Sequence, residues 1–375
     1  MTQKHWRNVK KITLLSFALA LLTLLILISP LGQSMINAWL TSKLVENRDI
    51  DVTIGSLFAN PVGDTSFSDV LIRDHKGDTL IYIGQFEFES YRIAQLINNN
   101  IHLGNAKIDG LFLNVKRHNK DKKTNLDLFA EKLKPKTPNG RRYEASKINV
   151  VGAKLSFADN NKAKSIGNTF TDLHGELSDF SSQGDVVSFY INQMSFFVDE
   201  QDLQVTNLQT QFSHDALKTS FENLVVSTPN SLFASDVKMT YPKGGMQSFN
   251  EKVRIDAVVR ETVLGLGDIQ KIYPDVSTDG SVAIQYAKFM GTLNDFSVSS
   301  FKARFENSML SGALSHKANQ SFFTITTLST TYDDIARAFA SCLSWVVMID
   351  LCFCFFHIEF CLIGSRLAST RAENG

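Results

Sequence analysis

The chain has 375 residues, and 38 basic residues balance 38 acidic ones. A chain without net charge has no field that gathers nucleic acid, so we expect no nucleic-acid partner. Proline is scarce, at 7 residues, and phenylalanine is abundant, at 28, which favours ordered β structure over disorder.

The N-terminus predicts a membrane anchor. Four basic residues within 1–11 precede residues 12–31, which carry no charge. A helix of about 20 residues spans the hydrocarbon core of a bilayer. We therefore expect an uncleaved transmembrane signal anchor, with 1–11 in the cytoplasm and residues from 32 onward across the membrane. The alternative is a cleaved signal peptide, whose apolar region is usually shorter. The anchor includes Ile12, Leu14, Leu15, Leu25, Ile26 and Leu27.

Residues 34–48 have apolar side chains at helical spacing and predict a helix beside the membrane. From residue 49 the apolar period changes to two, and turn residues recur every ten to fifteen positions. This pattern predicts antiparallel β-strands. The segment "TLIYIGQFEFES" shows it clearly and places Leu80, Tyr82, Phe86 and Phe88 on one face. The preceding turn contains Asp74 and Asp78, which suit backbone capping, and Gly77, which suits a positive φ.

Similar alternation predicts strands in many later segments. They lie within 49–58, 101–117, 147–159, 186–198, 217–228, 235–242, 253–261, 281–291, 296–308 and 321–329. Three short helices are predicted at 91–100, 125–133 and 263–275, where they cover sheet edges. The basic segment 116–142 is interpreted as a solvated loop.

No catalytic or nucleotide-binding motif occurs in the chain. The histidines at 102, 118, 174, 214 and 316 are scattered through polar positions, and we interpret each as a surface residue. We expect no enzyme activity, no cofactor and no metal.

Several segments together resemble a known family. In chain order they are the anchor, "DIDVTIGSL", "FSDVLIRDHKGDTLIYIGQFEFESYRIAQLINNN" and "TNLDLF". Their order resembles the N-terminal region of the TamB proteins of the AsmA-like superfamily. The later segments "NLVVSTPNSLFASDVKMTYP" and "GSVAIQYAKFMGTLNDFSVSSFKARF" are similar to repeats of that family. The resemblance covers residues 1 to about 335.

This resemblance implies a mainly β fold, in which an N-terminal transmembrane helix precedes an elongated, curled antiparallel groove with a few short helices. It implies an inner-membrane protein whose region 32–340 lies in the periplasm. Its partners would be phospholipid acyl chains and an outer-membrane barrel assembly protein, and its role lipid transport or outer-membrane protein assembly and secretion. The expected groove residues are Phe86, Phe88, Leu111, Leu113, Val115, Phe301 and Phe305. The alternative is an anchored scaffold in which the same side chains fill a closed β core.

The last part of the chain departs from this pattern. Residues 341–375 lose the alternation and contain every cysteine, namely Cys342, Cys352, Cys354 and Cys361, so the body holds no disulfide framework. A frameshift or early stop in a longer repeat protein is one interpretation, which we favour. A second membrane helix over 343–363 and a metal site are the others. From the residue count we expect ~20 strands and a groove about 100 Å long.

Overall fold

The computed structural model describes the central part of the chain. The described residues are 34–35, 37–38, 42, 49–59, 64–90, 100–133, 142–161, 166–242, 248–274, 280–317 and 320–331. The anchor predicted at 12–31 and the tail at 341–375 lie outside them. So does the helix predicted at 91–100, except for Asn100, which begins a strand.

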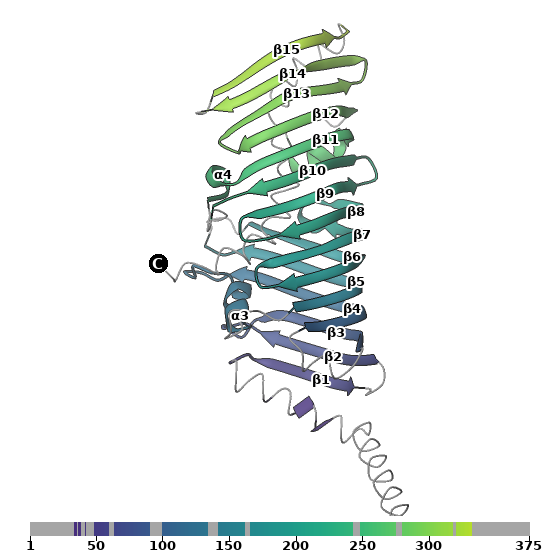
Figure 1. Cartoon of the computed structure of the whole chain (residues 1–375), viewed down its shortest axis with the longest axis vertical. Coiled ribbons are helices and arrows are strands. Elements are labelled where there is room, and N and C mark those ends of the chain that lie inside the picture. Colours follow the sequence, from purple (N-terminus) through teal and green to yellow (C-terminus); the bar gives the residue numbers. More distant parts are fainter. Residues whose placement is uncertain are drawn as a thin grey trace, which may run out of the picture.

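The described chain forms one sheet of fifteen strands, and their order in the sheet is their order in the sequence. Figure 1 shows them stacked along the long axis of the molecule, as a curled sheet that does not close. The mainly β prediction is confirmed. The strands are β1 Val52–Ala59, β2 Asp64–Arg73, β3 Thr79–Ser90, β4 Asn100–Arg117, β5 Arg142–Asp159, β6 Ile166–Gln183, β7 Val186–Val198, β8 Leu203–His214, β9 Lys218–Ser227, β10 Leu232–Thr240, β11 Arg254–Gly265, β12 Ser281–Thr292, β13 Asp295–Phe305, β14 Ser308–Lys317 and β15 Gln320–Ser329.

The described chain has fewer strands than the predicted ~20, partly because β4, β5 and β6 each have 18 residues. At ~4.8 Å between neighbouring strands, the sheet is about 70 Å long, against the 100 Å expected.

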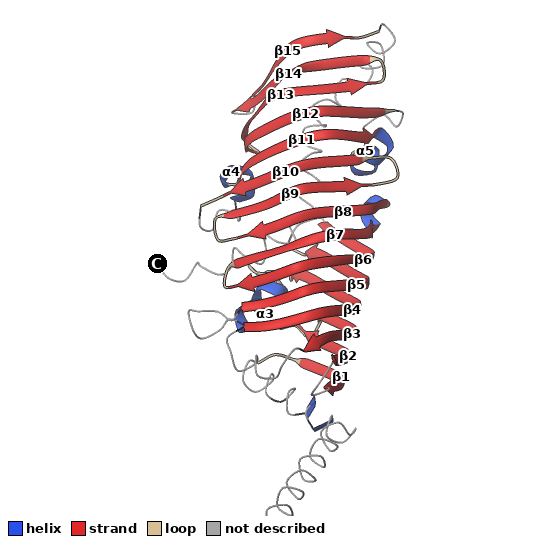
Figure 2. Cartoon of the chain, turned by 45° about the vertical axis from the view of Figure 1, so that its right-hand side comes forward, coloured by secondary structure: helices blue, strands red, loops and turns tan. Residues whose placement is uncertain are grey.

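The helices are short and lie beside the sheet (Figure 2). They are α3 Asn125–Leu133, the 3-10 turn η2 Asp199–Gln201, α4 Phe249–Lys252 and α5 Leu266–Ile272. The helix predicted at 125–133 is confirmed, and the one predicted at 263–275 is shorter than expected because residues 263–265 belong to β11. Before residue 49, residues 34, 35, 37, 38 and 42 are helical.

One strand pair corrects the antiparallel prediction, since β4 and β5 pair in parallel. Parallel neighbours need a crossover connection, because the chain must return to the same end of the sheet before the next strand begins. Residues 118–141 provide it, and α3 lies within them. The segment interpreted as a loop is therefore a crossover that contains a helix.

In most strands the side chains on the core-facing side alternate with a period of two, and this alternation shifts by one residue near the middle of the strand. We call this shift a parity change. In β11 the buried positions are Ile255, Ala257 and Val259, followed by Thr262 and Leu264. A residue with positive φ lies at or near several of these changes, and such residues bend and twist a strand as a bulge does. They include Asp69, Gly110, Gly152, Asn223 and Glu261. This repeated bend accounts for the curl of the sheet.

The parity change also corrects a predicted face in β3. Ile81 packs with Leu113 and Leu155 of neighbouring strands against one cluster, and Leu155 also packs against the cluster that contains Val150. Phe86 reaches the same face, because it pairs with Ile108, which pairs with Val150. Tyr82 follows Ile81 directly and lies on the other face, where its hydroxyl donates to Asp69.

Candidate functional site

Two cross-strand rows of apolar side chains run the length of the sheet. Residues directly opposite each other on paired strands share a face, so a row can be followed from strand to strand. The first row crosses β1 to β10 and consists of Leu57, Phe67, Phe86, Ile108, Val150, Gly175, Met194, Leu208, Val226 and Phe233. The second crosses β7 to β15 and consists of Phe189, Phe212, Phe221, Val237, Ala257, Phe289, Val298, Leu314 and Phe323.

The two rows overlap over β7 to β10, and Met194 and Phe189 pack against the same core cluster. We call the face that carries both rows the apolar face. It extends from the first strand to the last, and at β6 the first row passes through Gly175, which has no side chain.

The opposite face of the sheet is polar. Its side chains belong to the residues next in sequence to those of the apolar rows. Beside the first row runs a second row made of Ser66, Glu87, Lys107, Asn149, Glu176 and Gln193. Beside the other apolar row, Ser188, Ser213, Ser220, Lys238 and Asp256 follow one another in the same way. The sheet is therefore amphipathic from β2 to β11, as expected where one face meets water. At its ends the polar face also carries Phe58, Met290 and Phe322.

Burial on the apolar face varies along the sheet. In the middle, Val237, Met239 and Ile255 are at most 2% exposed, and Phe249 of α4 and Ile269 of α5 belong to or pack against their cluster. Toward the N-terminal end, Phe67, Phe86 and Phe88 are half-buried and lie with ring centroids 5.1 to 6.4 Å apart. At the other end, every residue of β15 is exposed.

The expected groove residues lie at both ends of this face. Phe86 and Phe88 pair with Ile108 and Ala106 of β4, and Leu111 and Leu113 pair with Ile83 and Ile81 of β3. Near the other end, Phe301 pairs with Ala287, and Phe305 pairs with Val282.

Val115 differs from these residues. It is 4% exposed and shares a cluster with Leu126 of α3. The Val115 side chain is therefore covered by other side chains of the protein and has almost no surface left for a ligand.

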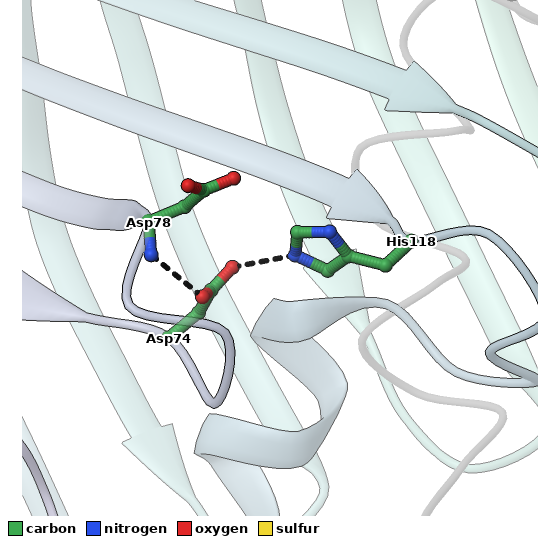
Figure 3. A group of neighbouring side chains, drawn as sticks. All are labelled: Asp74, Asp78 and His118. Atoms are coloured by element: carbon green, nitrogen blue, oxygen red, sulfur yellow. Dashed lines mark hydrogen bonds and ion pairs between the residues drawn. The ribbon is translucent and has the colours of Figure 1, made fainter.

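A polar cluster holds the crossover to the N-terminal strands, and Figure 3 shows its centre. The Asp74 side chain is fully buried, and its two carboxylate oxygens accept four hydrogen bonds. One oxygen accepts from the backbone N–H groups of Lys76 at 2.9 Å and Asp78 at 3.0 Å. The other accepts from His118 Nε2 at 2.8 Å and Asn125 Nδ2 at 3.0 Å. We call this set the Asp74 hub.

Helix α3 is joined to β4 through the same hub. Asn125 donates from Nδ2 to the carbonyl of Asn114 as well as to Asp74, and its Oδ1 accepts from the backbone of Lys116. Thr124 and Asp127 form a reciprocal capping box at the start of α3, because the Thr124 hydroxyl accepts from the Asp127 backbone while Asp127 accepts from Thr124. Burial raises the pKa of Asp127, and its hydrogen bonds to Thr124 oppose this only in part.

The hub also contains the arrangement closest to a metal site in the described chain. Potential ligand atoms of Asp74, Asp78 and His118 lie within 4.8 Å of one another. However, both Asp74 oxygens already accept hydrogen bonds, and Lys116 Nζ lies 3.3 Å from Asp78. The donor set thus fits a hydrogen-bonded structural hub better than a cation.

The turn prediction before β3 is confirmed for two residues. Asp74 caps the backbone of the turn, and Gly77 has a φ of 86°. The Asp78 side chain instead pairs with Lys116. The sequence did not predict that these residues form one cluster. The segments "DHKGDT" and "TNLD", which contain Asp74 and Asn125, are the sequence signal that could have indicated it.

Two histidines correct the surface interpretation. His118 has a side chain only 14% exposed in the hub, and His214 is 3% exposed at the end of β8. His102 and His174 have side chains 40% and 47% exposed and conform to the prediction.

Within the described residues, no helix has both the length and the apolar character needed to cross a membrane. The predicted anchor falls outside that part of the chain, so it remains a prediction. The fold and the face together define a class, namely a long, open, curled β-sheet with one continuous apolar face. No protein-family model matches the chain, and no curated protein matches it either.

Proposed function

We propose that this protein holds the acyl chains of phospholipids against the apolar face of its sheet and carries them away from the membrane that anchors it. In this proposal residues 12–31 anchor the chain in an inner membrane, and the sheet extends through the periplasm toward the outer membrane. Lipid delivery there would support the assembly of outer-membrane proteins with a barrel partner. The transfer needs no cofactor and no reacting side chain.

The continuity of the two apolar rows carries this proposal. A row of side chains from Leu57 to Phe233, overlapped by a row from Phe189 to Phe323, gives an acyl chain an apolar surface from β1 to β15. Burying one CH₂ group contributes about 0.8 kcal/mol, so a long acyl chain gains on the order of 10 kcal/mol relative to water.

A second candidate function rests on the buried middle of the sheet. Val237, Met239 and Ile255 are packed as a closed core would be. In that case the sheet is a periplasmic scaffold whose partners are proteins. The two candidates make different predictions for the exposed end of the apolar face.

Neighbouring phenylalanines in β15 provide a matched test. Phe323 pairs with Leu314 on the apolar face, whereas Phe322 pairs with Ser315 on the polar face. Both side chains are more than half exposed, so neither substitution is expected to unfold the sheet. We expect Phe323→Glu to slow the transfer of a fluorescent phospholipid between vesicles about tenfold. A carboxylate costs roughly 2.5–3.5 kcal/mol at the centre of a bilayer and less at this half-exposed position, and tenfold corresponds to about 1.4 kcal/mol.

The control Phe322→Glu should change transfer by less than twofold. Equal effects of the two substitutions, or no transfer by the unsubstituted protein, would favour the scaffold.

A further inference from the structure

A buried histidine lies on the apolar face without a partner for one of its ring nitrogens. His214 ends β8 and is paired with Val187 of β7 and Thr219 of β9. Val187 and Phe212, two residues before it, both contribute to the main core cluster. The ring is 3% exposed, and its Nε2 is buried without a hydrogen-bond partner.

The other ring nitrogen is well occupied. The hydroxyl of Thr219 lies 2.7 Å from Nδ1, and the hydroxyl of Tyr241 lies 3.2 Å from it. These two hydroxyl groups are 2.8 Å apart. Because the two hydroxyl groups also bond to each other, two proton arrangements fit this geometry. In one, Thr219 donates to Nδ1 and the ring proton resides on Nε2. In the other, Nδ1–H donates to Thr219. In the first arrangement, an N–H donor at Nε2 faces the apolar surroundings unpaired.

The ring is neutral, which limits the ligand that it suits. Burial lowers the pKa of His214, and the carboxylates of Asp215 and Asp185 oppose this effect only in part. The same two carboxylates disfavour an anion at Nε2. A neutral acceptor attached to an apolar chain is the complementary group.

We propose that Nε2 of His214 donates a hydrogen bond to the ester carbonyl oxygen of an acyl chain bound on the apolar face. This inference rests on the proposed function and adds the chemical class recognised, namely a neutral acyl ester rather than a free carboxylate. The ring is almost fully buried, so neighbouring side chains must move aside for the carbonyl to reach Nε2 along the face. Phe212, Val187 and Met239, which pairs with Thr219, surround that position.

Buried polar groups almost always have partners, and an orphan N–H lowers the stability of the folded protein. Among the described polar side chains on the apolar face, Thr210 bonds to a backbone carbonyl and Ser235 does likewise. His214 differs from them because its Nε2 has no partner, and a bound ester would satisfy an N–H at that position.

The test compares three probes of similar chain length on the full chain in amphipol, namely methyl laurate, laurate and tridecane. We expect methyl laurate to bind more tightly than tridecane. His214→Asn retains a polar atom near the position of Nδ1 but lacks Nε2, and it should weaken methyl laurate binding about tenfold while leaving tridecane binding unchanged. The control His174→Asn, on the exposed side of β6, should change neither.

A second measurement needs no variant. The ¹⁵N resonance of His214 Nε2 should be that of a protonated nitrogen, and it should shift on addition of methyl laurate but not of tridecane. A proton on Nδ1, unchanged ester affinity in His214→Asn, or preference for laurate over its methyl ester would overturn the proposal. If neither methyl laurate nor tridecane binds, the proposed function itself fails, which is a different result.

Discussion

Replacing Asp74 with alanine is expected to release α3 and the first strands from the rest of the sheet. The substitution leaves His118, Asn125 and two backbone N–H groups without their acceptor in a buried position. Removing one partner from such a buried charged network costs roughly 3 kcal/mol or more. Hydrogen exchange of amides in β2 to β4 and α3 should therefore speed up by about a hundredfold, because 1.4 kcal/mol corresponds to tenfold.

Asp78→Asn is the matched control, four residues along the same turn. Its side chain is 50% exposed, and its ion pair is with Lys116 at 3.3 Å. Exposed ion pairs contribute about 0–1 kcal/mol, so exchange should change little. Equal protection in Asp74→Ala and the unsubstituted protein would show that the hub does not hold this end of the sheet.

The same hub predicts a dependence on pH. Burial opposes ionisation of Asp74, but hydrogen bonds from His118, Asn125 and the backbone of Lys76 and Asp78 outweigh it and lower its pKa to about 2. An unfolded aspartate titrates near 4, so the unfolded chain takes up the proton first as the pH falls. The contribution, about 2 kcal/mol, is complete above pH ~4 and is lost as the pH approaches ~2. Exchange in Asp74→Ala should lack this part of the pH dependence.

Replacing Gly291 with alanine is expected to disrupt the hairpin of β12 and β13. Gly291 has a φ of 141°, a conformation that residues with a side chain rarely adopt. A Cβ atom there would lie 2.5 Å from the Phe296 Cα and closer still to the backbone oxygen of Asp295. Strain and overpacking together should lower the free energy of unfolding of this region by about 3 kcal/mol. Urea denaturation, monitored by hydrogen exchange of the amides in β12 and β13, measures this change in the free energy of unfolding.

A second glycine supplies a control with the opposite sign. Gly267 lies inside α5, and a Cβ atom there would meet nothing within 4 Å. Gly267→Ala should stabilise the protein by about 0.5–1 kcal/mol, because alanine loses less backbone entropy in a helix. A neutral Gly291→Ala would mean that the hairpin relaxes around the new methyl group.

Alternation in the sequence predicts strands well where large apolar side chains are frequent, even where the alternation shifts once. The segment 79–90 coincides with β3, and 186–198 coincides with β7. Strand β8 was missed, because only Leu203, Val205, Leu208 and Phe212 are large apolar residues among its twelve, and most of the others are polar. Strand β6 was missed for a related reason, since it is rich in Ser, Thr and Asp and buries few apolar side chains.

Other features depend on contacts between distant segments. The parallel pairing of β4 and β5 follows from the path of the crossover, which alternation does not encode. The burial of His214 arises from Thr219, Tyr241 and the apolar neighbours around it, whereas in the sequence it lies beside the polar turn that begins at Asp215. Phe86, Leu113 and Phe301 were predictable as apolar-face residues because their alternation is local.

Site-specific photo-crosslinking in cells tests the central claim most directly. A photoreactive amino acid is placed in turn at Phe86, Met194 and Phe323 on the apolar rows. Matched controls are the neighbouring polar-face positions Glu87, Gln193 and Phe322. We predict phospholipid adducts at all three apolar positions and at none of the controls. Absence of lipid from all three, in protein that is otherwise folded, would contradict a hydrocarbon path along the sheet.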